Sequence, residues 1–480
     1  MLFCTEIVYL YSLISTTDRM KIENTSQQEI QTIIKAQRAF FRSGETLDLS
    51  YRQKALCALS KALKQWEPRI AEALWKDLHK SYEEAYLTEL SIVLGEIDNH
   101  LRHLKIWTAA KPVGTPIKMM PSKSKVVAEP LGCTLIMAPW NYPVQLLLNP
   151  LVGAISAGCT AVLKPSPYVP HTSKVMEEMI KETFPTEYIA VVQGNREVNT
   201  ALLEERYDLI FFTGSPQLGR TVMRAASENL TPVVLELGGK SPCIVDKDAN
   251  IGMAARRIAW GKSLNAGQTC IAPDYLLVHA DIKDQLISAL KKEFTALLGE
   301  NPKEAKHFVR IVNERAFDRL VDYIQGANVV MGGEYDRSER YISPTIIDNV
   351  DVNSPIMQEE IFGPIFPVVT FTSTDQAIDF VVDREKPLAL YYFSENLKNI
   401  RRMLKHTSSG GCCINDTIMH IANEKLPFGG VGASGMSAYH GKESFKVFSH
   451  YRAVVTTTTL LDLPFRYMPY KFFKWVKGLL

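Results

Sequence analysis

Three things are scarce in this 480-residue sequence: net charge, long apolar runs, and cysteines arranged to bind metal. The 54 Lys and Arg residues nearly balance the 52 Asp and Glu residues, which leaves a formal charge of +2. Without a broad basic field, nucleic acid is not an expected partner. No uninterrupted apolar run reaches the roughly 18 residues that a membrane-spanning helix needs.

The eight cysteines contain no CxxC pair and no Cys/His cluster at zinc-ligand spacing, so no metal site is expected. Cysteines used in this way are typical of a reducing compartment, and we expect a cytoplasmic protein. A content of 46% hydrophobic and 22% charged residues excludes a disordered, collagen-like or coiled-coil chain. The length fits about three domains at roughly 150 residues each.

The two ends of the chain are its least typical parts. Residues 1–19 are apolar but lack the basic segment and the small-residue cleavage site of a signal peptide. Because Met20 begins a polar, helix-forming stretch, Met1 and Met20 are both candidate starts. Near the other end, lysines recur every three residues across 471–477 among aromatic and aliphatic residues. This pattern indicates a basic amphipathic helix that either contacts a membrane surface or packs on its own domain or a partner subunit.

Short apolar runs alternate with helical patterns in the middle of the chain, after a helical region at about 27–110. The apolar runs lie at 133–138, 160–164, 188–193, 208–213 and 232–237. The helical patterns between them lie at 143–157, 171–184, 196–206 and 216–229. This alternation predicts a parallel sheet with helices on both faces. Ligands of such sheets bind beyond the carboxyl ends of the strands, here the loops at 139–142, 164–168 and 213–216.

A second alternating region follows a boundary that we place near Leu237. Strands are expected near 275–279, 365–371 and 389–393, and helices near 282–297, 314–325 and 375–384. The Pro- and Lys-rich stretch 111–130 predicts an extended arm rather than a core element. The late β-prone segment 448–458 is expected to pair with this arm.

Two segments of the first region are suited to hold a ribose or a phosphate. The run IFFTGSPQLGRTVM (210–223) ends a strand and opens a helix, and its Gly214 and Gly219 would let backbone N–H groups approach a phosphate. Lys164 follows a buried-looking strand, from which its ammonium would reach ribose or phosphate oxygens. Taken singly, the first is as often a plain tight turn and the second is more often a solvated lysine.

Three residues have the functional groups of covalent acyl chemistry. Glu236 lies inside an apolar strand, where burial would make it a base near neutral pH, unless it is simply hydrogen-bonded to loop backbone. Cys270 ends the polar, flexible stretch SLNAGQTC (263–270) as an accessible thiol, although most single cysteines are inert core residues. Asn141 lies in PWNYP (139–143), a rigid turn that would present an amide to an oxyanion or serve only as a turn.

In this order along the chain, these residues closely resemble the aldehyde dehydrogenase superfamily. LELGGKSP and NAGQTC are specific signatures of that family, and EIFGP (360–364) and LPFGGVGASG (426–435) add two more. The similarity runs from about residue 27 to residue 458. The early start and the stretch YHGKESFKVFSHYR (439–452) look most like the class 3 branch. Members of that branch are typically dimers that act on hydrophobic or aromatic aldehydes.

The resemblance implies an α/β fold with a Rossmann-type parallel cofactor domain, an α/β catalytic domain and a β oligomerisation arm. The dinucleotide-binding domain would comprise 20–110 and 132–236, and the catalytic domain 237–447. The oligomerisation arm would comprise 111–131 and 448–458. The basic amphipathic C-terminal tail would comprise 459–480. A homodimer is the expected assembly.

The resemblance also implies catalytic roles, and those roles are chemically coherent. Cys270 would be the nucleophile and Glu236 the general base, while Asn141 and the Cys270 backbone N–H would form the oxyanion hole. A hydrophobic aldehyde, aliphatic or aromatic, would form a thiohemiacetal on Cys270 and lose hydride to a nicotinamide, which leaves a thioester. Glu236 would then activate the water that releases the carboxylic acid.

The expected cofactor is NAD or NADP. By the same resemblance, Lys164 would contact the adenosine ribose, the turn Thr213-Gly214-Ser215 and the helix with Gly219 would line the phosphates, Glu360 would hold the nicotinamide ribose, and Phe362 would pack beside the nicotinamide. Many relatives place a glutamate three residues after the lysine, where it disfavours a 2′-phosphate. Here that position is Pro167, so the electrostatic objection to NADP is relaxed.

Two rival activities remain open from the sequence. A CoA-acylating aldehyde dehydrogenase would transfer the acyl group to CoA, although Glu236 as a water activator argues against it. A Glu-Lys-Cys hydrolase or amidase would use Glu236, Lys240 and Cys270 without any dinucleotide. A non-enzymatic protein is not expected, since the nucleophile, base and amide are all intact.

Overall fold

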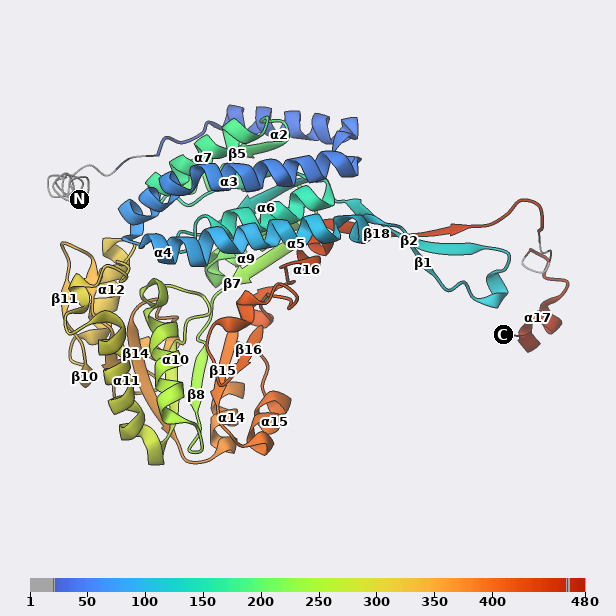
Figure 1. Cartoon of the computed structure of the whole chain (residues 1–480). Helices are drawn as coiled ribbons and strands as arrows, with labels where there is room; N and C mark the ends of the chain where they lie inside the picture. The colour runs from blue at the N-terminus through green and yellow to red at the C-terminus, as the bar shows by residue number, and fades with distance from the viewer. Residues whose placement is uncertain (1–19, 21, 463, 465–466, 480) are drawn as a thin grey trace.

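The computed structural model describes residue 20, residues 22–462, residue 464 and residues 467–479 (Figure 1). Two lobes lie one above the other in this view, and a narrow arm projects sideways from the upper lobe. The apolar segment 1–19, which bears on the choice between Met1 and Met20 as the start, lies outside the described residues.

The upper lobe contains a six-stranded sheet in the order β17-β7-β6-β3-β4-β5. Its strands are β3 (Cys133–Met137), β4 (Thr160–Lys164), β5 (Ile189–Val191), β6 (Leu209–Gly214), β7 (Val233–Leu237) and β17 (Gly435–Met436). All pair in parallel except β17, which runs antiparallel to β7 at the edge. The strands predicted from this part of the sequence are confirmed, because each apolar run is buried between two layers of helices.

Helices cover both faces of this sheet. The crossover helices are α6 (Gln145–Ala157), α7 (Pro170–Thr183), α8 (Arg196–Glu204) and α9 (Pro216–Ser227). The N-terminal helical region comprises α2 (Gln27–Ser43), α3 (Leu49–Leu78), α4 (Tyr82–Ala85), the π-helical turn η3 (Tyr86–Leu90) and α5 (Ser91–Thr108). One face of the sheet packs on α3, α5, α6 and α7, and the other packs on α2, α8 and α9. This is the doubly covered parallel sheet that the alternation predicts.

The lower lobe contains a seven-stranded sheet in the order β10-β13-β14-β9-β8-β15-β16. Its strands are β8 (Pro242–Val245), β9 (Tyr275–His279), β10 (Val329–Met331), β13 (Thr345–Ile347), β14 (Ile365–Phe371), β15 (Ala389–Phe393) and β16 (Gly411–Ile414). The helices are α10 (Ile251–Ser263), α11 (Lys283–Leu298), α12 (Glu314–Ile324), α13 (Pro355–Gln358), α14 (Thr374–Val382) and α15 (Leu397–His406). The predicted strands and helices are found. The sequence analysis missed the strands β8, β10, β13 and β16, which are three or four residues each, and the helices α10, α13 and α15. Of these helices, α15 buries only Met403.

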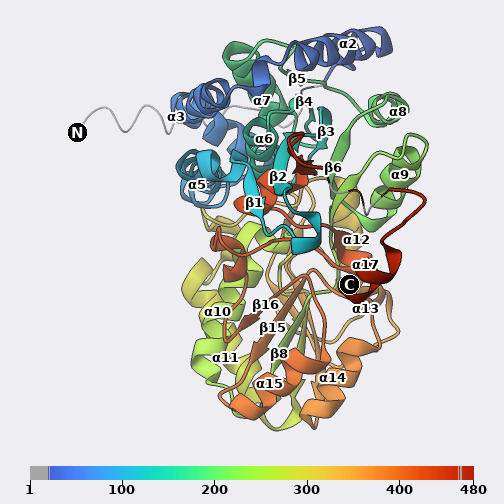
Figure 2. The same cartoon turned by 90° about the vertical axis from the view of Figure 1, so that its right-hand side faces the viewer.

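The arm is a three-stranded antiparallel sheet of β1 (Lys111–Val113), β2 (Lys123–Pro130) and β18 (Ser449–Thr456), in that order. Strand β18 follows the whole of β2, from Ser449 opposite Pro130 to Thr456 opposite Lys123. The predicted pairing of the late segment with the arm is therefore confirmed. Figure 2, turned by 90°, looks along the arm toward the lobes. Most side chains of β1 and β18 are exposed.

The C-terminal tail ends in α17 (Phe473–Leu479), which lies at the far end of the arm in Figure 1. Phe472 and Phe473 are 50% and 60% exposed. Among the described residues, no helix is both long enough and apolar enough to cross a bilayer.

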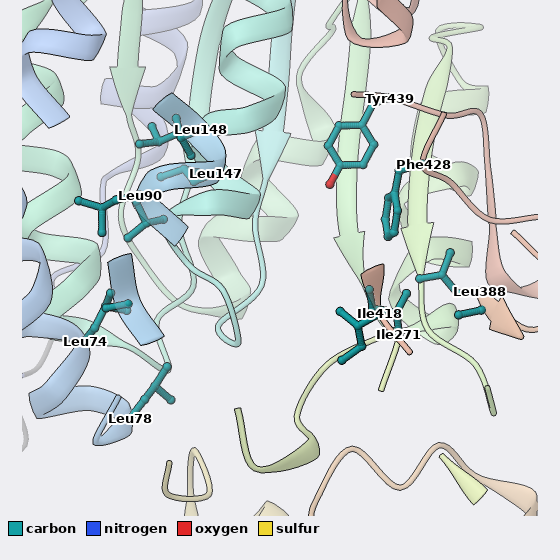
Figure 3. Close-up of a cluster of buried hydrophobic side chains, with 14 of the residues drawn as sticks. Leu74, Leu78, Leu90, Leu147, Leu148, Ile271, Leu388, Ile418, Phe428 and Tyr439 are labelled. Atoms are coloured by element: carbon teal, nitrogen blue, oxygen red, sulfur yellow. The ribbon is translucent and has the colours of Figure 1, made fainter. Parts of the chain in front are cut away.

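One buried apolar cluster joins the lobes. Figure 3 shows residues of this cluster in two groups, one from α3, η3 and α6 and the other from the segments around Ile271, Ile418 and Phe428. Because the lobes share this core, residues from both can be held at fixed positions where they meet.

Candidate active site

The carboxyl ends of four neighbouring strands of the upper sheet carry predicted site residues. Lys164 ends β4 opposite Met137 of β3, and Asn141 lies in the loop that follows β3. On the other side of β3, Thr213 of β6 pairs with Glu236 of β7. Because parallel strands end at the same edge, the structure brings these residues of the sequence prediction together.

Asn141 links this edge to the lower lobe. Its side-chain Nδ2 donates to the carbonyl of Gln268 at 3.0 Å, two residues before Cys270. Its own backbone carbonyl accepts hydrogen bonds from Nζ of Lys80 and from Nδ2 of Asn265, both at 3.1 Å. An amide nitrogen carries two N–H groups, so one of them remains to donate to a substrate oxygen.

The turn before Cys270 is buried and strained. Asn265 and Ala266 have positive φ values of 52° and 51°, which most side chains avoid. Gly267 follows at φ 71°, and a Cβ there would collide with the carbonyl of Gly363. The side chain of Gln268 donates to the carbonyls of Asn265 and Arg310 at 3.1 Å each. The prediction of a flexible stretch is therefore wrong, since hydrogen bonds and close packing fix it.

The Cys270 thiol is half-buried beside carboxyl groups rather than beside a cation. Burial, together with the nearby Glu360 and Glu236, raises the pKa of this thiol far above its usual value, although N–H groups of Cys270 and Ile271 partly offset the effect. The apolar and acidic surroundings favour the neutral thiol over the thiolate. A base or a bound positive charge must therefore stabilise the thiolate.

Glu236 is almost completely buried, with 2% of its surface exposed. Neither carboxyl oxygen has a hydrogen-bond partner within the part of the chain that the structure describes. The alternative of a glutamate bonded to loop backbone is thus wrong. Burial raises the pKa of Glu236 well above the usual carboxyl range, which makes its ionised form a strong base.

Glu360 enters the site from the lower lobe, between α13 and β14. Its carboxylate lies so close to Gly238 that a Cβ at that glycine would collide with it. Burial, and next the charge of Asp274, raise the pKa of Glu360 to about 8, while the N–H of Gly239 acts in the opposite direction. The Glu360 carboxylate therefore packs against the glycine turn that follows Glu236.

Lys240 holds the segment that carries Glu360. Its Nζ forms an ion pair with Asp274 and donates to the carbonyls of Ile356 and Glu359, each at 2.8 Å. Asp274 in turn accepts the Ile361 N–H at 2.9 Å. With its three donors engaged in this way, Lys240 does not bridge Glu236 and Cys270. The geometry thus gives no support to a Glu-Lys-Cys hydrolase.

The remaining predicted residues surround the same edge of the upper sheet. Nζ of Lys164 is buried and donates to the carbonyl of Pro165 at 2.8 Å, and burial lowers the pKa of Lys164 to about 8. Oγ1 of Thr213 is buried without a partner among the described residues. Ser215 caps α9 by accepting the Leu218 N–H at 3.4 Å. These polar groups have donors or acceptors left for a ligand.

At Gly214 and Gly219, close packing leaves no room for a larger residue. A Cβ at Gly219 would lie 2.7 Å from Leu237, and one at Gly214 would lie 2.6 Å from the Phe212 ring. Gly219 therefore allows α9 to pack closely on β7, and Gly214 leaves room for the Phe212 ring of its own strand. From the lower lobe, the Phe362 ring packs edge-to-face on the Trp140 ring, with the two ring centroids 5.3 Å apart.

No group of three or more metal-ligating side chains occurs in the described ranges.

Comparison with known proteins identifies the family of this chain. A family model described as "Aldehyde dehydrogenase family" matches residues 11–454. The chain belongs to the aldehyde dehydrogenase family. It is 49% identical to 4,4'-diaponeurosporen-aldehyde dehydrogenase of Staphylococcus aureus, over 92% of this chain and 97% of that protein.

Other aldehyde dehydrogenases agree with the class 3 resemblance. The chain is 48% identical to aldehyde dehydrogenase family 3 member A2 of Mus musculus, over 86% of each chain. It is 44% identical to the dimeric NADP-preferring aldehyde dehydrogenase of Canis lupus familiaris, over 92% of this chain and 98% of that one. The solved substrate-bound AldH of Staphylococcus aureus has a TM-score of 0.92 and 48% identity, covering 94% of this chain and 99% of its own.

Several residues that support this aldehyde dehydrogenase site were not found from the sequence. Asp274 has no motif of its own, and Lys240 was weighed only as part of the rival hydrolase. Lys80, Glu84 and Glu89 lie in the helical region, where Ser81 with Glu84 resembles a helix start. Charged residues there indicate a solvated face, and only the tertiary packing shows that Lys80 and Glu89 are buried and that Glu84 is half-buried.

Proposed function

We propose that this chain oxidises a hydrophobic aldehyde to the carboxylic acid, with NAD or NADP as the oxidant. Cys270 is the nucleophile, Glu236 is the general base, and Asn141 is the oxyanion donor in this proposal. The observation that carries it is the meeting of these groups between the lobes, with the Glu236 carboxylate buried and free of hydrogen-bond partners in the described structure.

The first step is attack on the aldehyde. After a base has removed the thiol proton, the Cys270 sulfur bonds as the thiolate to the carbonyl carbon, and the carbonyl oxygen becomes an oxyanion. The free N–H of the Asn141 amide and the backbone N–H of Cys270 stabilise that charge. The Gln268 carbonyl, which accepts the other Asn141 N–H, keeps the amide aimed at the substrate.

The second stage forms and hydrolyses a thioester. When bound, an oxidised nicotinamide dinucleotide supplies the hydride acceptor and a positive charge near the thiol. Loss of hydride from the tetrahedral adduct leaves an acyl group on Cys270. Glu236 takes a proton from a water molecule that attacks this acyl group, and the acid leaves with the thiol restored.

The residues present fit such a dinucleotide. The buried Lys164 ammonium suits an adenosine ribose, and Thr213 with Ser215, at the start of α9, suits the phosphates. Glu360 would hold the nicotinamide ribose, with Phe362 beside the ring. No carboxylate stands at Pro167 to repel a 2′-phosphate, which favours the use of both cofactors.

A hydrophobic substrate is supported by two observations. Ile271, next to the nucleophile, is buried together with Ile418, Phe428 and Tyr439, which belong to the right-hand group in Figure 3, so the nucleophile has apolar neighbours. The name of the Staphylococcus aureus relative specifies 4,4'-diaponeurosporen-aldehyde as its substrate.

The experiment is an aldehyde panel assayed with NAD and with NADP on the purified protein. We expect reduced cofactor and carboxylic acid in equal amounts, with higher kcat/KM for long or aromatic aldehydes than for acetaldehyde. A rate that requires CoA and yields acyl-CoA would instead favour the acylating rival. Hydrolysis of amides without any dinucleotide would favour the hydrolase.

Assembly and location are part of the same proposal. The arm of β1, β2 and β18 supports a homodimer, since β18 has an unpaired edge in the described sheet and one relative is named as dimeric. The lysines at 471–477 and the exposed Phe472 and Phe473 support contact of a cytoplasmic enzyme with a membrane surface. Sedimentation velocity tests the dimer. Co-sedimentation with anionic vesicles, compared between the full chain and a variant ending at Thr458, tests the tail.

A further inference from the structure

A fully buried ion pair lies behind the oxyanion donor, outside every signature segment of the sequence. Nζ of Lys80 and Oε1 of Glu89 are 2.6 Å apart, and both side chains are 0% exposed. Lys80 follows α3, and Glu89 belongs to the π-helical turn η3. Short π-helical turns within helices often occur where a side chain is positioned for function.

The pair contacts the loop that carries Asn141 at several points. Lys80 donates to the Asn141 carbonyl at 3.1 Å, and its Nζ lies 4.3 Å above the Tyr142 ring. Oε2 of Glu89 accepts the backbone N–H of Val144 at 2.8 Å and that of Gln145 at 3.3 Å. The cation therefore holds the middle of the loop, at Asn141, and the anion holds its end, where α6 begins.

The same region also reaches the nucleophile turn. The Tyr142 hydroxyl, under Lys80, contacts Oγ1 of Thr269 at 2.7 Å, next to Cys270. Glu84 accepts the Asn265 N–H at 2.8 Å, and Asn265 donates to the Asn141 carbonyl. Two catalytic loops from different lobes are thus tied to one short helical segment.

Stability alone does not account for the pair. Two buried charges lose their hydration, and replacing such a pair by apolar residues of similar volume is often neutral or stabilising. Apolar residues could not hold a carbonyl and two N–H groups of the loop, however. We infer that Lys80 and Glu89 are positioning residues, which fix the Asn141 amide at the distance the oxyanion requires; this rests on the proposed role of Asn141.

The test is a double-mutant cycle between the ion pair and Asn141. The variant K80M/E89L replaces both charges, so neither is left buried and alone, and should stay folded with unchanged NADH binding by fluorescence titration. We expect kcat/KM for aldehyde, and the dinucleotide-independent hydrolysis of p-nitrophenyl acetate, to fall about 100-fold, as expected for a misplaced catalytic group. N141A alone should lose about 100- to 1000-fold.

The decisive measurement is the activity of the triple variant K80M/E89L/N141A relative to that of N141A. If the pair acts through Asn141, its removal has no further effect in the N141A background, within about threefold. Losses that multiply, or a double variant with near wild-type turnover, would overturn the inference. Full activity of N141A would instead refute the proposed function, and the ion-pair assignment with it.

Two further variants serve as an alternative to K80M/E89L and as a control. If K80M/E89L does not fold, E89Q, which retains the shape of the side chain, is placed in the same cycle. A loss of about tenfold that vanishes in the N141A background is expected there, and additive losses count against the inference. K283M/D348N, which removes the 2.7 Å ion pair between Lys283 and Asp348 of the lower lobe, is the control and should keep turnover within about twofold.

Discussion

The two sides of the site are built by different means. On the upper lobe, Lys164, Thr213 and Glu236 lie at the ends of regular parallel strands, so the sheet itself brings them together. On the lower lobe, Cys270 follows a buried turn with two consecutive non-glycine residues in the left-handed region. Strand order alone positions the first group, whereas the second depends on particular tertiary contacts. We therefore expect mutations of the strained turn to affect both stability and turnover.

The largest expected effect is that of the nucleophile. C270A should lower kcat for aldehyde oxidation by at least about 10⁴-fold, because no other described thiol lies beside Glu236 and Glu360. Binding of NADH should be retained, since the strand-end residues are untouched. Fluorescence titration and steady-state assays check both points, and substantial turnover by C270A would remove the basis of the mechanism.

The second effect concerns the base. E236Q should slow hydrolysis of the acyl-enzyme by about 10²- to 10⁴-fold while the first hydride transfer persists as a burst. Because burial raises the pKa of Glu236, the carboxyl is protonated at low pH and the hydrolysis rate of the wild type should rise with increasing pH. The variant should lack this rise. Stopped-flow absorbance of the reduced cofactor, measured across pH, distinguishes the two stages.

The third effect is on the stability of the strained turn before Cys270, compared with that of helix α5. G267A places a Cβ against the Gly363 carbonyl at positive φ and should destabilise the fold by about 1–3 kcal/mol. G95A is the control, since a Cβ there meets nothing within 4 Å in α5 and should stabilise by about 0.5–1 kcal/mol. Urea unfolding of both variants measures the difference, and equal stability would mean that the turn is not strained.

The smallest expected effect is on cofactor choice. P167E introduces a carboxylate that, in the proposed cofactor arrangement, would lie beside the adenosine ribose. It should raise the KM for NADP about tenfold, equivalent to ~1.4 kcal/mol, with little change for NAD. Parallel KM measurements with the two cofactors test it. An equal change for both would show that position 167 affects the loop rather than the 2′-phosphate.

The upper lobe could be predicted from the sequence in some detail, for a physical reason. Buried parallel strands such as 133–137 and 209–214 are nearly all apolar, and their order places Lys164 and Glu236 at one edge. The signature segments added Cys270 and Glu360 by resemblance.

The supporting residues could not be predicted in the same way. The pairs Lys80–Glu89 and Lys240–Asp274 depend on tertiary packing, and their charges look like surface residues in the sequence. The protonation state of the Cys270 thiol could not be predicted either, because its pKa depends on burial and on two carboxyl groups that lie far away in the chain. The short strand β16 and the polar helix α15 were missed since they bury few side chains.

The most direct test of the covalent mechanism is mass spectrometry of E236Q, quenched soon after mixing with NAD and a long-chain aldehyde. We expect one acyl group per chain, located on the peptide that contains Cys270 and removed by hydroxylamine. Acyl groups on another residue, or wild-type turnover with no covalent adduct, would contradict it.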